Sequence, residues 1–137
     1  MILHANCVAI DGFGVLIKGA SGSGKSALSL QLMALGASLV SDDRTLIETR
    51  GDRLWASCPA TLRGMIEARG VGILQTPAIE RAALTTIIDM DVIETQRLPE
   101  TRETQIAGIS LPVLHKVESY AFPASIVAYI QGGKVPL

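Results

Sequence analysis

The sequence predicts a single α/β domain, residues 1–137, built on a mixed and strand-rich sheet. Two observations lead to this expectation. A glycine-rich loop at residues 19–26 stands between an apolar strand pattern and a helical pattern, which is the order found in a P-loop. Elsewhere, apolar runs of strand length outnumber helical patterns and do not alternate regularly with them, so a doubly wound fold is not expected.

The chain opens with a hairpin followed by a helix. Residues 6–10 and 14–18 are apolar runs separated by an Asp-Gly-Phe turn at 11–13, which is a hairpin signal. Leucines then recur at helical spacing in residues 26–35, and Gly36 stands where a glycine commonly ends a helix. These patterns predict two paired strands, the glycine-rich loop and one helix, in that order.

The next segment predicts a short strand and a second hairpin. Residues 38–41 are apolar and run directly into Asp42 and Asp43. Residues 45–49 and 53–57 flank a Gly-Asp pair, which predicts a tight turn between two strands. The glycine-punctuated stretch that follows carries no clear pattern, so no element is assigned to it.

The C-terminal third alternates between apolar and polar segments. Residues 83–90 predict a buried strand, and residues 96–105 are polar and predict a loop. Residues 106–114 predict a further strand, broken by Pro112. Residues 123–131 predict a closing helix that ends at a pair of glycines.

Composition indicates an oligomer and excludes several classes of protein. Charged residues make up 18% of the chain, below the roughly 25% of typical soluble domains, so part of the surface is expected to be buried between identical subunits. The net charge is −1 and aromatic residues are only 4%, so no nucleic-acid partner is expected. The two cysteines lack metal-type spacing and are typical of a reducing compartment. No signal peptide and no membrane-spanning stretch is recognised, which predicts a cytoplasmic protein without a membrane partner.

The glycine-rich loop has the chemistry of a phosphate-binding site. Its pattern G-x-x-x-x-G-K-[ST] would match a chain of this length by chance on the order of once in a few hundred. Backbone N–H groups and a helix N-terminus would face the phosphates, a lysine would reach the β and γ phosphates, and a hydroxyl would bind Mg²⁺. The predicted nucleotide-binding residues are Gly19, Ala20, Ser21, Gly22, Ser23, Gly24, Lys25 and Ser26.

Asp42 and Asp43 are candidates for metal binding or proton transfer. They end the strand that follows the predicted loop helix, and a strand–helix–strand crossover brings that end close to the loop. If both residues are extended, their side chains point to opposite faces and only one of them faces a nucleotide squarely. The residues alone do not decide which one, and a solvated turn is the alternative.

His4 is expected near the loop because of the first hairpin. If Ile10 pairs with Gly14, His4 lies opposite Ala20, and a turn one residue different places it opposite Gly19. Either register brings a group that can carry a proton close to the phosphates. An edge-strand histidine without a function is the alternative.

Glu67, Arg69 and Arg97 are weaker candidates. Glu67 and Arg69 are two residues apart, so in an extended segment they share a face and could serve a metal and a phosphate. A surface ion pair explains them equally well. Arg97 lies in the predicted polar loop and by itself resembles a solvated charge.

Together these residues resemble the catalytic domain of the HPr kinase/phosphorylase family, which phosphorylates a serine of HPr, a small phosphocarrier of the sugar phosphotransferase system. His4 stands where this family has a histidine before the loop, and residues 39–43 resemble its strand ending in paired aspartates. Residues 66–73 resemble the family signature E-x-R-G-x-G, and residues 96–98 the segment with a further arginine.

The resemblance implies a P-loop fold like that of HPr kinase and phosphoenolpyruvate carboxykinase, here as a short form with the catalytic domain only. It implies ATP and Mg²⁺ as cofactors, an HPr-like phosphocarrier as the protein substrate, and a homohexamer. It assigns Asp43 as the proton acceptor and Glu67, with Ser26, as the metal-binding pair. The catalytic residues that it implies are His4, Lys25, Asp43 and Arg97.

Departures from the family leave alternatives open. Ala27 stands where the family usually has glutamate, and residues 114–120 lack the Arg- and Gly-rich character associated with dephosphorylation, so kinase activity is better supported than the reverse reaction. A small-molecule kinase or NTPase, with Arg97 and Arg102 in a lid, is one alternative. A regulator that senses ATP without useful catalysis is another.

Overall fold

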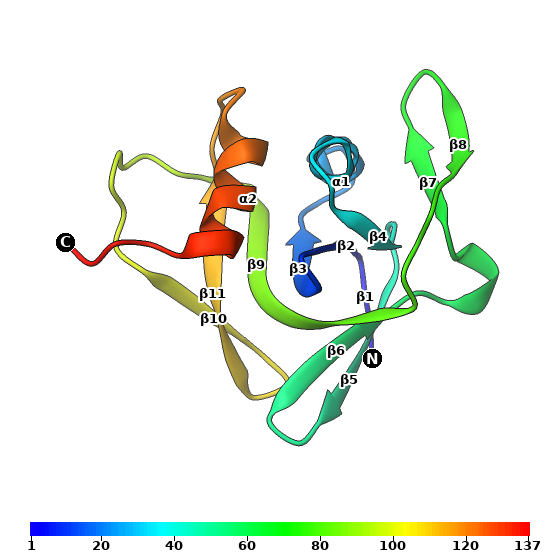
Figure 1. Ribbon diagram of the computed structural model, residues 1–137, viewed down its shortest axis with the longest axis horizontal. Coiled ribbons are helices and arrows are strands. Elements are labelled where there is room, and N and C mark those ends of the chain that lie inside the picture. The colour runs from blue at the N-terminus through cyan, green and yellow to red at the C-terminus, as the bar shows by residue number, and fades with distance from the viewer.

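A nine-stranded mixed sheet carries the fold, and the computed structural model describes the whole chain, residues 1–137 (Figure 1). Seven strands run across the sheet in the order β1-β5-β6-β9-β3-β2-β4, and β11 pairs with both β9 and β10. The strands are β1 (Ile2–Leu3), β2 (Ala5–Ile10), β3 (Phe13–Lys18), β4 (Ser38–Ser41), β5 (Thr45–Arg50), β6 (Arg53–Ser57), β9 (Arg81–Ile93), β10 (Arg102–Ile106) and β11 (Ile109–Lys116).

The remaining elements lie outside this sheet. A separate hairpin consists of β7 (Met65–Ala68) and β8 (Gly72–Gln75), and the helices are α1 (Lys25–Ala34), α2 (Phe122–Gly132) and a short 3₁₀ turn at Ala60–Leu62. Neither α-helix is long and apolar enough to cross a membrane. The architecture is therefore the mixed, strand-rich α/β sheet that the sequence predicts.

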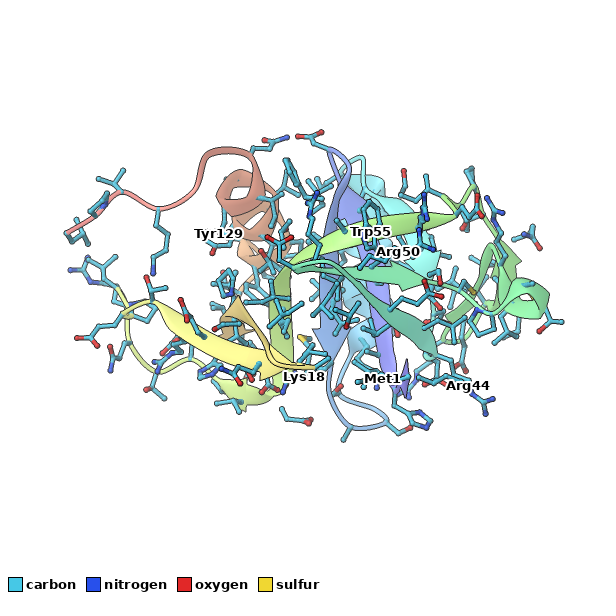
Figure 2. All side chains as sticks on the ribbon, turned by 90° about the horizontal axis from the view of Figure 1, so that it is seen from below. Met1, Lys18, Arg44, Arg50, Trp55 and Tyr129 are labelled. Atoms are coloured by element: carbon cyan, nitrogen blue, oxygen red, sulfur yellow. The ribbon has the colours of Figure 1, made fainter.

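The strand directions bring several carboxyl ends to one edge of the sheet. β2 pairs antiparallel with both β3 and β4, so β3 and β4 run in the same direction with β2 between them. β9 runs parallel to β3, and β11 runs parallel to β9. The glycine-rich loop follows β3 at this edge, where Figure 2 labels Lys18, the last residue of that strand. Ligands of open α/β sheets commonly bind beyond such ends.

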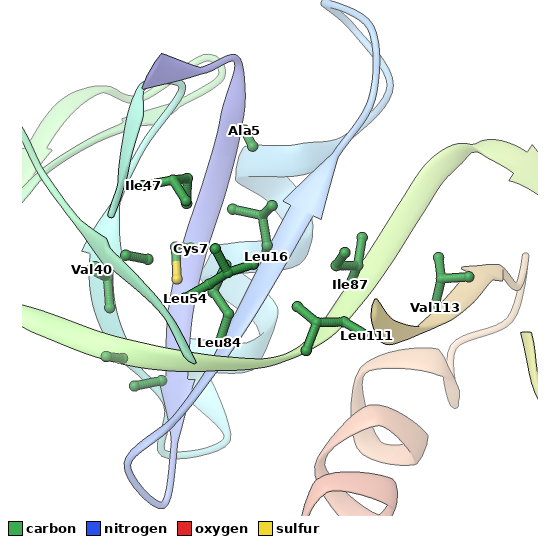
Figure 3. Close-up of a cluster of buried hydrophobic side chains, with 13 residues drawn as sticks. Ala5, Cys7, Leu16, Val40, Ile47, Leu54, Leu84, Ile87, Leu111 and Val113 are labelled. Carbon is green, nitrogen blue, oxygen red and sulfur yellow. The ribbon is translucent and has the colours of Figure 1, made fainter. Parts of the chain in front are cut away.

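Both faces of the sheet are buried, which explains the continuous apolar runs. Alternate residues of β2 and β3 belong to different clusters, because successive side chains point to opposite faces. One cluster of 13 buried residues includes Cys7 and Leu16 (Figure 3). The other, of 12 residues, packs Val8 and Ile17 against both helices. Burial raises the pKa of the Cys7 thiol to about 12, so this cysteine is a core residue.

Two of the predicted elements need correction. The segment 96–105 is only partly a loop, because β10 begins at Arg102; its exposure alternates along an outer strand, and outer strands tolerate polar residues. The predicted strand 106–114 starts only at Ile109, because Ile106 ends β10 and residues 107–108 form a turn, and Pro112 does not break β11, which runs unbroken to Lys116. Pairing of β11 with β9 starts only at Val113, so Pro112 lies outside that ladder.

Candidate functional site

The glycine-rich loop, residues 19–26, joins the end of β3 to the first turn of α1. Gly24 adopts a left-handed conformation, with a φ of 99°, and no side chain caps the helix N-terminus. A β-carbon at Gly19 would lie 2.5 Å from Ser23 Oγ and 3.0 Å from Met90 Cβ, so only glycine fits there. The uncapped helix end and the glycines leave backbone N–H groups available for an anion.

Lys25 is buried and lies over the loop. Its Nζ atom donates hydrogen bonds to the carbonyl oxygens of Gly19, at 2.6 Å, and Ala20, at 3.3 Å. The ammonium group is therefore held inside the loop by the loop itself. Phosphate oxygens would be stronger acceptors for this group than neutral carbonyls.

Two charged residues that sequence reasoning missed also contact the loop. The Ala20 N–H donates to Asp91 Oδ1 at 2.9 Å, and Lys116 Nζ lies 3.5 Å from the carbonyl oxygen of Ser23. Asp91 follows the buried stretch of β9, and Lys116 ends β11. Both residues could have been predicted from the sequence, because each is a charged residue at the end of a strand pattern, and such strand ends commonly line ligand sites.

Ser26 and Asp42 meet beside the loop. The Ser26 hydroxyl donates to Asp42 Oδ1 at 2.6 Å, and the backbone N–H of Glu67 donates to Asp42 Oδ2 at 2.9 Å. Asp42 therefore joins the start of α1, the end of β4 and the strand β7. No three His, Cys, Asp or Glu side chains converge anywhere in the chain. A hydroxyl and one or two carboxylates nevertheless fit Mg²⁺, which prefers oxygen ligands and commonly keeps waters and substrate phosphates.

Asp43 is arranged differently from its neighbour. β4 ends at Ser41 and Asp43 adopts a left-handed conformation, with a φ of 64°, so the expectation for extended residues does not apply. The Asp43 side chain is exposed, and its Oδ1 atom lies 3.9 Å from His4 Nδ1. Ala5 pairs with Lys18, and continuing this register places His4 opposite Gly19, which is the second of the two predicted registers.

A buried asparagine, also missed from the sequence, lies beneath the two aspartates. Asn6 is fully buried in β2 and hydrogen bonds to Asp42, to the backbone of Asp43 and to Ser29 of α1. The available signal was an amide side chain inside an otherwise apolar strand. Such a group needs hydrogen-bond partners when it is buried.

Arg97 is not brought to the glycine-rich loop. It is exposed, makes no hydrogen bond or ion pair, and lies in the connection between β9 and β10. Figures 1 and 2 place this connection beyond α2, on the far side from α1. Arg69 lies in the turn after β7 and forms no ion pair with Glu67.

A cavity of about 390 Å³ lies away from the loop, between α2 and the strands β10 and β11. An ion pair of Glu94 and Arg102, 2.9 Å apart, borders it. The hydrogen bond from Arg102 lowers the pKa of Glu94 to about 2. A smaller cavity of about 240 Å³ adjoins the loop at Ser23 and Gly24 and is lined by Lys116.

Comparisons with known proteins agree with this arrangement. Residues 1–104 match the family described as HPr Serine kinase C-terminal domain. An HPr kinase/phosphorylase from Clostridium tetani is 38% identical over 91 residues, which are 66% of this chain and 29% of that protein. The enzyme of the same name from Aromatoleum aromaticum is 32% identical, over 94% of this chain and 45% of its own length.

A solved structure extends the likeness to the fold. The Hpr(Ser) kinase/phosphatase from Coxiella burnetii superposes with a TM-score of 0.81 at 28% identity, covering 96% of this chain and 94% of the solved chain. The chain thus spans less than half the length of the two curated relatives and nearly all of a solved one. From the matched residues and the shared fold, this chain belongs to the HPr Serine kinase C-terminal domain family.

Proposed function

We propose that this chain is the catalytic part of an ATP- and Mg²⁺-dependent protein-serine kinase that phosphorylates an HPr-like phosphocarrier. The observation that carries the proposal is the 2.6 Å contact between Ser26 and Asp42, with the exposed Asp43 beside it. The contact brings a loop hydroxyl and a carboxylate together where phosphates and a metal would meet. Membership of the HPr Serine kinase C-terminal domain family favours phosphoryl transfer as the chemistry of this geometry.

The loop and Lys25 bind the phosphates in this proposal. The uncapped N-terminus of α1 and the loop N–H groups other than those of Ala20 and Ser23 would face the phosphate oxygens, and Lys25 would exchange its carbonyl partners for the β and γ phosphates. Ser26, Asp42 and Glu67 would hold Mg²⁺, which when bound neutralises charge on the phosphates. Asp42 is added to the two metal-binding residues expected from the sequence because its Oδ1 atom contacts the Ser26 hydroxyl.

Asp43 accepts the proton of the substrate serine hydroxyl. Its carboxylate accepts no hydrogen bond from another side chain and faces solvent, whereas both carboxylate oxygens of Asp42 are occupied. His4 lies on the Asp43 side and stabilises developing negative charge when it is protonated. Arg97 has the same task by resemblance, and it reaches the site only through movement of the β9–β10 connection or from another copy of the chain.

Mass measurement after incubation with ATP, Mg²⁺ and a purified HPr-like protein tests the proposal. The HPr-like protein should gain one phosphoryl group, and the Lys25→Ala variant should neither transfer it nor bind ATP with normal affinity. Nucleotide binding without transfer would instead support the ATP-sensing regulator. Transfer to a small molecule only would support a small-molecule kinase. Intact turnover in Lys25→Ala would show that the loop assignment is wrong.

A further inference from the structure

We propose that Asn6 is a positioning residue that holds Asp42 against Ser26 and fixes the backbone of Asp43. The inference rests on the proposed function and adds a residue to it. Asn6 is the second residue of β2, and 0% of its surface is exposed. It contacts the adjacent aspartates and the loop helix, and so joins β2 to two segments that are far from it in the sequence.

The hydrogen bonds of Asn6 leave none of its polar atoms without a partner. Its Nδ2 atom donates to Asp42 Oδ1 at 2.6 Å and to Ser29 Oγ at 3.0 Å, which uses both amide hydrogens. Ser26 Oγ lies 3.4 Å from the same nitrogen. The Oδ1 atom of Asn6 accepts from the backbone N–H of Asp43 at 2.9 Å.

The chemistry of these partners fixes the orientation of the amide. The backbone N–H of Asp43 can only donate, so it requires the oxygen of Asn6, and an ionised Asp42 carboxylate can only accept, so it requires the nitrogen. Neither an aspartate nor an aliphatic residue at position 6 would satisfy both neighbours. The amide nitrogen of Asn6 therefore binds the Asp42 side chain, and its amide oxygen binds the Asp43 backbone.

The backbone of Asp43 needs this support. A φ of 64° is a left-handed conformation that is unfavourable for a residue with a side chain. Two contacts from β2 hold it: the Ala5 N–H donates to the Asp43 carbonyl at 3.1 Å, and Asn6 accepts from the Asp43 N–H. Without Asn6, only the hydrogen bond from the Ala5 N–H remains to hold the backbone of Asp43.

Asn6 also connects Asp42 to the phosphate loop. Through Ser29, whose hydroxyl donates to the Lys25 carbonyl at 2.9 Å, the amide is joined to the first turn of α1. Asp42 receives hydrogen bonds on the same oxygen from Asn6 and from Ser26. Residues that orient metal-binding groups in this way typically contribute 10- to 100-fold to metal affinity or activity.

Asn6→Leu tests the inference, because leucine has a similar branched shape and no hydrogen-bonding atoms. Thr45→Val is the matched control, since it removes another buried hydrogen bond to β2, from Thr45 Oγ1 to the Ala5 carbonyl oxygen at 2.7 Å, without touching Asn6 or either aspartate side chain. Binding of a fluorescent ATP analogue is measured as a function of Mg²⁺, together with kcat and KM for ATP and the melting temperature. Asn6→Leu should raise the Mg²⁺ concentration for half-maximal binding and lower kcat, each about 10- to 100-fold. Binding without Mg²⁺ should change less than about threefold, because the loop and Lys25 remain.

A folded Asn6→Leu variant with the same Mg²⁺ dependence and kcat as Thr45→Val and the wild type would overturn the inference. If leucine prevents folding, Asn6→Val, a smaller and strand-favouring replacement, is held to the same criterion. The binding measurement needs no protein substrate, so it still decides the role of Asn6 if the wild-type chain transfers nothing to an HPr-like protein. A wild-type chain that binds no nucleotide would overturn this inference and the proposed function together.

Discussion

At the scale of single residues, the neighbours Asp42 and Asp43 have different surroundings at the end of β4. Asp42 accepts hydrogen bonds on both oxygens, from Ser26 and Asn6 on one and from Glu67 on the other. Asp43 has a left-handed backbone and an exposed side chain close to His4. A carboxylate with occupied oxygens suits metal positioning, whereas an exposed one can accept a proton.

Replacing Asp43 tests this division of roles. Asp43→Asn keeps the shape but cannot accept the serine proton, so it should lower the forward and reverse rates by similar factors, about 10² to 10⁴ each. ATP affinity should change little, because Asp43 is assigned to the hydroxyl and not to the phosphates. Single-turnover rates in both directions, with separate measurement of nucleotide binding, check the expectation.

Asp42→Asn is the informative partner of that experiment. It should mainly weaken Mg²⁺-dependent nucleotide binding, because its carboxylate contacts Ser26. If Asp42→Asn instead produced the equal loss in both directions while Asp43→Asn did not, Asp42 would be the proton acceptor and the assignment would be reversed.

At the scale of elements, an ion pair ties the end of β9 to the start of β10. Arg102 donates to both Glu94 oxygens, and only 8% of the Glu94 side chain is exposed. The backbone N–H of Glu94 also donates to the carbonyl oxygen of Lys116, whose side chain reaches the glycine-rich loop. The ion pair therefore supports a strand end that borders the proposed site.

The free energy of unfolding should depend on pH in a way that shows the contribution of this ion pair. Folding lowers the pKa of Glu94 from about 4.5 to about 2, so its stabilisation is fully present above about pH 4.5 and is lost as the pH falls through 2. Glu94→Gln should be less stable than the wild type near neutral pH, and the difference should shrink on acidification below 4.5. Urea unfolding at a series of pH values measures it.

Glu48→Gln is the control for that experiment, because the Glu48–Arg50 pair is exposed and contributes little. The free energies of unfolding of the wild type and Glu94→Gln are compared from neutral pH down to pH 2. A difference that stays constant over this range would contradict the expected role of the carboxylate charge.

The contact between β3 and β9 depends on a glycine. A β-carbon at Gly14 would lie 2.8 Å from the carbonyl oxygen of Ala83, at a position where the pairing of the two strands shifts register. Gly14→Ala should therefore lower the free energy of unfolding by about 1–3 kcal/mol, as overpacking does. Gly132→Ala, with open space around the added carbon, is the control and should be nearly neutral. Equal unfolding midpoints in urea for the two variants would contradict the expected clash.

At the scale of the whole molecule, the surface combines exposed apolar side chains with a low content of charged residues, 18% of the chain. Several large hydrophobic side chains are well exposed, among them Val71 at 75%, Ile73 at 62% and Leu98 at 61%. Val71 and Ile73 lie on the hairpin of β7 and β8, next to Glu67. Exposed apolar groups of this kind are often buried between subunits.

We therefore expect a homo-oligomer larger than a dimer, with a hexamer expected from the family resemblance. Burial of apolar surface between copies supplies the driving force. Light scattering at micromolar concentration should give a mass well above twice that of the chain. A monomer under these conditions would contradict both the composition argument and the one from resemblance.

The sequence by itself determined the position of the glycine-rich loop, the helix after it and the limits of β4 and of the two predicted hairpins to within one residue. The predicted strand 38–41 coincides with β4, and both predicted hairpins are present. These features follow from local periodicity and turn chemistry, which a window of about ten residues contains. The polar strand β10 was not predicted because its local sequence has no apolar strand pattern. Its pairing with β11, which lies later in the chain, makes it a strand.

The tertiary structure alone decided how the site residues meet. It brought Asn6, Ser26 and Asp42 together, although up to 36 positions separate them in the chain. It selected the hairpin register of His4 and left Arg97 away from the loop. Such contacts depend on strand order and register between distant segments, and a change of one residue in register would turn each side chain to the other face. No local pattern contains that information, because it arises only when the sheet is assembled.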